Sequence, residues 1–175
     1  PVARPADAEP GRGGIRVSMS RSLVAALDGV KAYMAAYRYS CIEQQLSRAV
    51  ALDDRKIWDE AVGNLSVYRD GDGLLRYFPV AGLAGSDALT AYVLTLSDLR
   101  GWPLPASEKE RMIAGLADFV SGRIERQSWA PGDLRLRKLA ALAALSRYGA
   151  ADAAMLGSLG LDPQDLPTGS LLDWI

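Results

Sequence analysis

The chain of 175 residues is 49% hydrophobic and 23% charged, the composition of one globular domain or of part of one. It holds 20 lysines and arginines against 21 acidic residues, and no block of like charge stands out, which argues against a nucleic-acid partner or a polybasic membrane contact. The absence of histidine removes Ser–His and Cys–His catalysis, and a single cysteine excludes an internal disulfide and a cysteine-rich zinc site. We therefore expect no metal and no cofactor.

Three segments of the chain differ in character. Residues 1–14 are rich in Pro, Gly and Ala, which is typical of a linker or a terminal edge. Apolar and polar residues alternate over 15–20, which predicts one short β-strand; no later segment offers it a partner, so we expect it to pair with a neighbouring β domain of a longer protein. Residues 21–175 have helical periodicity and predict an all-α domain, and their apolar last residues suggest that the domain continues.

Glycine, proline and capping residues divide this region into seven or eight helices joined by short loops into antiparallel pairs. Apolar residues recur three and four apart over 23–34, 42–50, 57–65, 89–99, 112–124 and 134–145, and two short helices are expected near 150–158 and 163–172. The predicted helix ends are an N-cap at Asp53 or Asp54, an N-cap at Ser86 or Asp87, a stop at Gly101, an N-cap at Ser107 and a stop at Gly149.

Residues 70–85 interrupt the helices. Asp70-Gly71-Asp72-Gly73 has the composition of a turn, because glycine tolerates positive φ, and the following apolar stretch is broken by Pro79, which predicts an ordered loop. The turn lacks the further spaced oxygen ligands and the late Glu of an EF-hand. We therefore expect a solvated turn and no calcium site.

The segment 37–45, Tyr-Arg-Tyr-Ser-Cys-Ile-Glu-Gln-Gln, holds the only cysteine where a helix is expected to begin. Residues i and i+3 at a helix start lie on one face, so the Cys41 sulfur can reach the carboxamide carbon of Gln44. Attack with loss of ammonia would give an internal thioester, an acylating agent, and the N–H groups of a helix start would stabilise a thiolate and an oxyanion. Tyr37 and Tyr39 are candidate shields against water. The alternative is that Cys41 is a small buried hydrophobe.

Residues 37–44, followed by Leu46-Ser47-Arg48-Ala49, resemble the thioester region of bacterial alpha-2-macroglobulins, which typically reads Tyr-Pro-Tyr-Gly-Cys-x-Glu-Gln and then a Ser-Arg pair. Here Arg38 replaces the Pro and Ser40 replaces the Gly, and neither change touches the reacting atoms. Three more stretches are similar to that family: the strand before the thioester domain, an Asp-Gly-Gly-Phe…Trp-Pro loop and an Asp-x-Trp-Leu-Thr-Ala-Tyr helix start, matched by 13–17, 72–79 and 86–94. The resemblance covers residues 13–100, and beyond them only helical periodicity agrees.

The resemblance implies the N-terminal part of a thioester-containing domain, an α/α toroid of paired helices, in a broad-spectrum protease inhibitor. A protease would cut a bait region elsewhere in the protein, and one of its amines would attack the exposed Cys41–Gln44 thioester and be held covalently, without enzymatic turnover. Ile42 and Glu43 would lie within the thioester ring, with Ile42 as a further cover. The implied partners are proteases and other domains of the same longer chain, and the implied location is the periplasm, with any membrane contact made by a lipid anchor outside these residues.

Two other classes of function stay open. Helical toroids also host enzymes that act on carbohydrates or isoprenoids, for which Glu108, Glu110 and Glu125 are the acids to test, although nothing spaces them as a carboxylate pair. A passive interaction scaffold would use the cysteine only for packing. Three tryptophans are expected to anchor the core or loops, with a carbohydrate platform as the alternative: Trp58, Trp102 and Trp129.

Overall fold

The computed structural model of the chain describes residues 6–7, 27–38, 40–126 and 133–175. The predicted strand over 15–20 lies outside the described residues, as do most of the predicted linker over 1–14 and the first residues of the helical region, 21–26. In the described part the chain is mainly helical, and its β-structure is limited to two isolated bridges, between Arg69 and Leu75 and between Leu75 and Ser86. The predicted all-α class is therefore confirmed.

The described residues form nine α-helices and a 3₁₀ turn, η2: α1 (Asp28–Ala36), α2 (Ile42–Leu52), α3 (Arg55–Val62), α4 (Leu65–Tyr68), α5 (Asp87–Arg100), α6 (Ala106–Val120), α7 (Asp133–Ser146), α8 (Ala153–Gly157), η2 (Pro163–Asp165) and α9 (Thr168–Trp174). None of these helices has the length and apolarity needed to cross a bilayer. Neighbours in sequence pack together in space, as hairpins require: α1 on α2, α2 on α3, α5 on α6 and α6 on α7. Further contacts of α5 with α2 and α7, and of α7 with α8 and α9, tie these pairs into one array.

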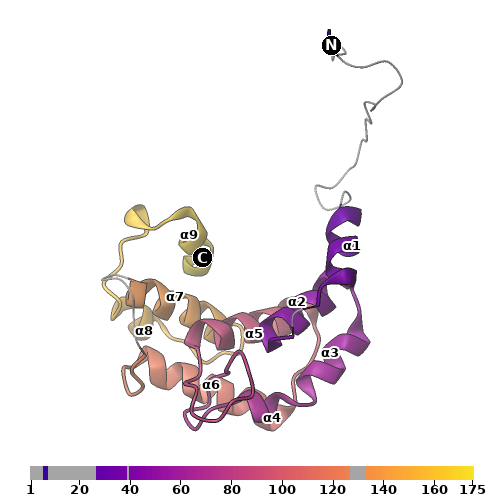
Figure 1. The fold of residues 1–175 in the computed structure, drawn as a ribbon. Helices are drawn as coiled ribbons and strands as arrows, with labels where there is room; N and C mark the ends of the chain where they lie inside the picture. Colours follow the sequence, from indigo (N-terminus) through magenta and orange to yellow (C-terminus); the bar gives the residue numbers. More distant parts are fainter. Residues whose placement is uncertain (1–5, 8–26, 39, 127–132) are drawn as a thin grey trace.

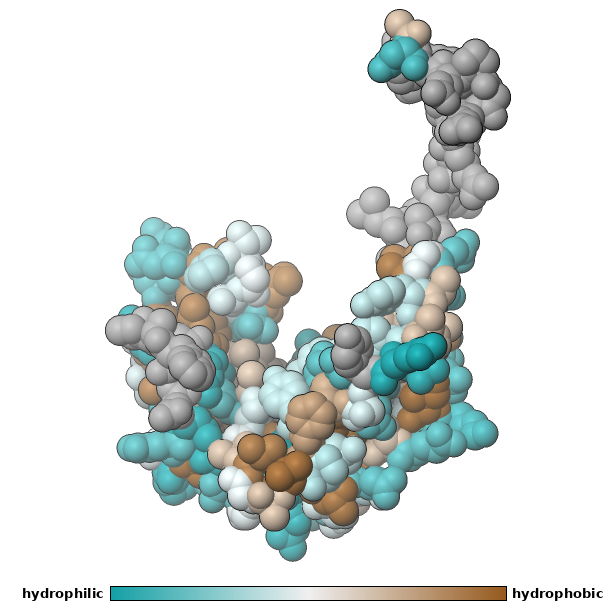
Figure 2. Space-filling model, in the orientation of Figure 1, coloured by the Kyte–Doolittle hydropathy of each residue, from teal (hydrophilic) through white to brown (hydrophobic). Residues whose placement is uncertain are grey.

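The array is an open crescent (Figure 1). Helices α1 to α3 form one arm, α4 to α6 form the base, and α7 to α9 form the other arm. The space-filling view shows the hollow between the two arms (Figure 2). Helix α2 contacts α1, α3 and α5.

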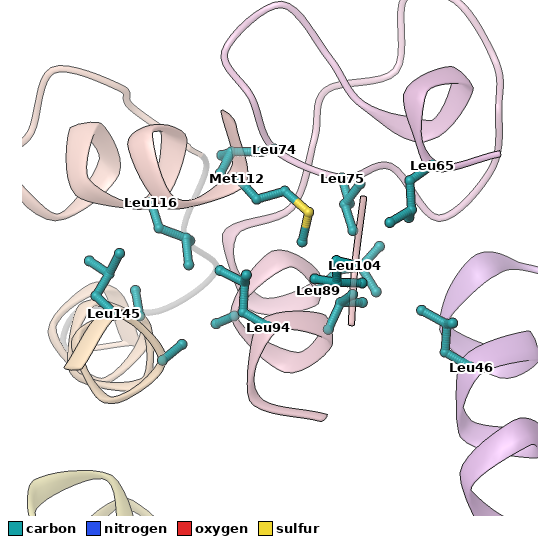
Figure 3. Close-up of a cluster of buried hydrophobic side chains, with 14 of the residues drawn as sticks. Leu46, Leu65, Leu74, Leu75, Leu89, Leu94, Leu104, Met112, Leu116 and Leu145 are labelled. Carbon is teal, nitrogen blue, oxygen red and sulfur yellow. The ribbon is translucent and has the colours of Figure 1, made fainter. Parts of the chain in front are cut away.

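A leucine-rich core lies buried between the helices (Figure 3). It joins α2 through Leu46, α5 through Leu89 and Leu94, and α6 through Leu116, all fully or almost fully buried. Burying one such side chain contributes about 1.5–3 kcal/mol, so packing of these apolar faces, more than helix propensity, holds the short helices in place. At the α3 end of the core, the Trp58 indole is completely buried.

Several predicted helix ends are confirmed by local hydrogen bonds. Asp54 caps α3 by accepting from two backbone N–H groups, and Ser86 caps α5 by accepting from the Leu89 N–H (3.2 Å). Gly101 ends α5 in the left-handed conformation, at φ +61°. These ends were predictable because each cap bonds within its own turn of helix.

Other predicted boundaries are wrong. The helix expected over 57–65 is divided at Gly63-Asn64 into α3 and α4. Helix α6 begins at Ala106 after Pro105, whose ring fixes a helix-compatible φ, so Ser107 lies in the first turn and not at the cap. It ends at Val120, before the left-handed Gly122 at φ +79°, so Ile124 lies beyond the helix although it still packs against the core. The predicted stop at Gly149 is confirmed by contrast: α7 ends at Ser146, and the left-handed Gly149 (φ +67°) closes its last turn by donating to the Ser146 carbonyl at 3.0 Å.

The loop between α4 and α5 is ordered, as predicted, but its first turn is not solvated. The Asp70 side chain is only 6% exposed and accepts from the backbone N–H groups of Asp72, Leu74 and Gly85 at 3.0, 2.9 and 2.7 Å. Arg126 completes the set with an ion pair at 2.8 Å. The prediction of a solvated turn is wrong for Asp70, because its carboxylate is the buried junction to which both ends of the loop are bonded.

The same loop packs against α6 through two glycines. A Cβ on Gly73 would lie 2.4 Å from the Arg111 carbonyl oxygen, and one on Gly115 would lie 2.5 Å from the Asp72 carbonyl oxygen. Gly73 also has φ +89°, a conformation that L side chains rarely adopt. The backbones can approach this closely only because neither residue has a side chain.

Candidate functional site

The candidate site lies at the first turn of α2. Cys41 is the N-cap of this helix, in extended backbone conformation at φ −67° and ψ 155°. The turn is fixed from the core side by the completely buried Ile42, whose backbone N–H donates to the Tyr77 carbonyl of the α4–α5 loop at 3.1 Å. Helix α2 and the loop braced by Asp70 therefore hold the cysteine backbone in place together.

Gln44 lies one turn along and bonds back to the cysteine. The Cys41 N–H donates to Gln44 Oε1 at 3.3 Å, and the Gln44 backbone N–H faces the Cys41 sulfur, which makes a capping box. The other end of the carboxamide donates from Nε2 to the Tyr37 hydroxyl at 3.2 Å. The structure thus brings together Cys41, Gln44 and Tyr37, with the amide group of Gln44 held at both its oxygen and its nitrogen.

The Cys41 thiol is closed off from solvent, with 4% of the residue exposed. Burial raises the pKa of the thiol above its ordinary value; the Gln44 backbone N–H acts in the opposite sense, and the nearby Glu43 carboxylate raises the pKa further. The sequence led us to expect that the helix start would favour a thiolate. The helix-start N–H group does act in the expected sense, but the cost of desolvating the charged form outweighs it.

Glu43 lies beside the sulfur and continues into a hydrogen-bonded chain. Cys41 Sγ faces Glu43 Oε2 at 3.9 Å, and Ser47 Oγ donates toward Glu43 Oε1 at 3.2 Å and the Glu43 carbonyl at 2.7 Å. Ser47 in turn bonds the Tyr92 hydroxyl of α5 at 2.7 Å. Sequence reasoning missed the roles of Ser47 and Tyr92, because 45 residues separate them and no local spacing signals their contact.

The remaining predicted site residues are placed differently. The Ile42 side chain belongs to the hydrophobic core, so it anchors the start of α2 to that core. Tyr37 is half-buried at the end of α1 and its ring contacts that of Tyr33, with centroids 5.4 Å apart. Tyr39 lies outside the described residues.

The acids named for an alternative enzyme differ in their surroundings. Glu108 is bound to Arg69 in an ion pair at 2.8 Å with little exposure, and Glu110 and Glu125 are exposed. Trp58 donates to the Pro103 carbonyl and its ring contacts Trp102, as expected of core anchors, while Trp129 lies outside the described residues. No group of three or more potential metal ligands occurs in the described part of the chain.

A cavity of about 250 Å³ lies in the other arm, between α7, α8 and α9. Leu142, Leu156 and Trp174 are among the residues that line it. Asp173 also borders it, and burial raises the pKa of this carboxyl. None of the residues of the Cys41 site lines this cavity.

Comparison of the chain with protein-family models, with curated proteins and with solved structures finds no match. The residues around Cys41 and their geometry are therefore the basis for inferring a function.

Proposed function

We propose that Cys41 and Gln44 form an internal thioester, and that the chain is part of a protease-trapping protein of the alpha-2-macroglobulin type. The observation that carries the proposal is the reciprocal contact at the start of α2. The Gln44 carboxamide oxygen accepts from the Cys41 N–H at 3.3 Å, one helical turn from the cysteine sulfur. The same contact closes the capping box of α2, which holds the Gln44 carboxamide beside the cysteine.

The bond forms by attack of Cys41 sulfur on the Gln44 carboxamide carbon. The new S–C bond replaces the C–N bond, the thiol proton and the amide nitrogen leave together as ammonia, and no other reactant is needed. The Cys41 N–H already points at the oxygen on which negative charge develops, as an oxyanion-hole donor does. The Gln44 Nε2 atom, which departs as ammonia, donates to the Tyr37 hydroxyl at 3.2 Å.

Shielding of the site supports a trap more than an enzyme. A thioester must be kept from water until its target arrives, and the cysteine is 4% exposed beneath its neighbours. Because the chain has no histidine to redirect the acyl group toward hydroxyls, amines of an attacking protease are the proposed targets. Capture is covalent and is used once.

The proposed domain type, location and partners follow from the resemblance of residues 13–100 to bacterial alpha-2-macroglobulins. The open crescent of paired helices is compatible with part of an α/α toroid (Figure 1), which is the arrangement proposed for residues 21–175. Other domains of a longer chain would supply the bait region, and the proposed location is the periplasm. Proteases are the proposed partners, and no cofactor takes part in the chemistry.

The test is the intact mass of the purified, unreduced protein before and after treatment with methylamine. We expect a mass one ammonia lighter than the sequence, then gain of one methylamine mapped to Gln44 and release of one titratable thiol. Cys41→Ser is the matched control, because it changes one atom and should show neither the deficit nor the uptake. A parent mass equal to the sequence, with no methylamine gained, would refute the thioester and leave a helical scaffold with a buried cysteine.

A further inference from the structure

The carboxylate of Glu43 lies between the reacting sulfur and a hydroxyl pair that crosses to another helix. Its Oε2 atom is 3.9 Å from Cys41 Sγ, and its Oε1 atom is 3.2 Å from Ser47 Oγ. The two carboxylate oxygens are thus engaged with different partners, one with the thiol and one with the hydroxyl. This division orients one oxygen toward the sulfur.

The hydroxyl pair fixes the carboxylate from α5. Tyr92 is half-buried and bonds Ser47 at 2.7 Å, so the chain of contacts runs from α5 through Ser47 to Glu43. Burial raises the pKa of Tyr92, which keeps its hydroxyl protonated and able to donate. When Tyr92 donates to Ser47, the single Ser47 proton is shared between the Glu43 carbonyl at 2.7 Å and the Glu43 carboxylate at 3.2 Å.

We propose that Glu43 is the proton shuttle of the thioester, and that Ser47 and Tyr92 are its positioning residues. The inference rests on the proposed Cys41–Gln44 bond. When an amine attacks the Gln44 carbonyl carbon, the N–C bond forms and the amine proton passes to Glu43. The C–S bond then breaks, and Glu43 delivers that proton to the departing sulfur of Cys41. The products are an amide and a thiol, and Glu43 is returned as a carboxylate.

Protonating the sulfur as it departs avoids leaving a charged thiolate in a buried position. Burial holds the thiol pKa of Cys41 above its ordinary value, so a bare thiolate is costly at this position. The chain has no histidine, and the other groups bonded at the site, Tyr37 from α1 and Tyr92 from α5, are phenols, which are weak bases at neutral pH. Glu43 is the carboxylate in contact with the sulfur. The same residue takes the thiol proton when the bond first forms, since that step is the reverse transfer.

The experiment compares the rate at which methylamine opens the thioester in the parent protein and in Glu43→Gln. General acid–base catalysis is worth roughly 10² to 10⁴ in rate, so we expect opening to slow by at least about tenfold. Glu60→Gln is the matched control, because the Glu60 side chain is exposed on α3 and its carboxylate pairs with Lys56 at 3.9 Å, away from the site; its rate should equal the parent rate. Tyr92→Phe keeps the ring and removes the hydroxyl, so its rate should fall between the two.

A second measurement separates catalysis from folding. In the opened protein, Glu43→Gln should lower the thiol pKa of Cys41, followed by the pH dependence of alkylation, because it removes the neighbouring negative charge. A folded Glu43→Gln protein that never loses ammonia would also support the proposal, by placing the residue in bond formation.

The two proposals fail in different ways. If the parent carries no thioester, the proposed function fails whatever Glu43 does. If the parent carries one and Glu43→Gln opens as fast as Glu60→Gln, or if its thiol pKa is unchanged, the shuttle is refuted while the thioester stands.

Discussion

Replacement of Asp70 by Asn tests whether the α4–α5 loop is held by one buried carboxylate. Asparagine has the same shape, and its single oxygen can still accept from the backbone N–H groups of Asp72 and Leu74. Its NH₂ group would then face the Gly85 N–H, 2.7 Å away, and the Arg126 guanidinium, 2.8 Å away, which are both donors. The substitution therefore leaves a buried backbone donor without an acceptor and removes the most buried partner of an arginine.

The magnitude follows from those two losses. A buried donor left without an acceptor costs about 1–3 kcal/mol, and the arginine loses a charge-assisted bond worth about 1.5–3 kcal/mol, part of which its second partner Asp72 retains. We expect Asp70→Asn to lower the free energy of unfolding by about 3 kcal/mol in urea titrations, with an unchanged m-value. Asp72→Asn is the control, because Asp72 bonds the same Arg126 Nη2 at 2.8 Å but is 52% exposed, and should cost less than about 1 kcal/mol. Equal losses for the two variants would refute the role of Asp70 as the buried junction.

Two further predictions concern the loop glycine and the titrating groups. Gly73→Ala should destabilise the fold by more than about 2 kcal/mol, because it places a side chain at φ +89° and a Cβ 2.4 Å from a backbone oxygen. Gly71→Ala, with nothing within 4 Å of the added Cβ, should barely move the melting temperature, and matching shifts would contradict the packing described. In the methylamine-opened protein, the folded-state pKa values of Cys41 and Tyr92 are raised above their unfolded values. Their contribution to the free energy of unfolding should therefore be constant below about pH 8.5 and should be lost as the pH rises through the folded-state pKa values. A free energy of unfolding that stays flat or rises from pH 8 to 10.5 would contradict the raised values.

The features that the sequence predicted correctly are those that depend on neighbours within a turn of helix. The N-caps at Asp54 and Ser86 bond to N–H groups two or three residues ahead, and the stop at Gly101 needs only the freedom of glycine. The spacing of Cys41 and Gln44 belongs to the same class, since i and i+3 lie together wherever a helix begins. In the structure each of these side chains meets the backbone N–H of the other residue, a contact confined to one turn of the helix.

The features that sequence reasoning missed depend on distant partners. Asp70 was expected to be solvated because its partner Arg126 is 56 residues away and nothing in the turn signals it. The bond between Ser47 and Tyr92 spans 45 residues in the same way. Desolvation of the Cys41 thiol comes from its burial in the folded chain, which the local sequence around a helix start does not signal, and it outweighs the effect of the helix-start N–H group on the pKa.

The two sides of the candidate site differ in how much buried apolar surface holds them in place. On the core side, α2 is anchored by side chains with no exposed area, namely Ile42, Leu46 and Ala49. On the opposite side, the Gln44 amide nitrogen is held by Tyr37 at the end of α1, a helix that has no buried residue. Displacing α1 sacrifices far less apolar burial than lifting α2, so local opening should favour the side that carries Tyr37. If the proposed thioester forms, its atoms would belong to the well-anchored helix α2, and the tyrosine that covers the amide nitrogen would follow the weakly packed helix α1.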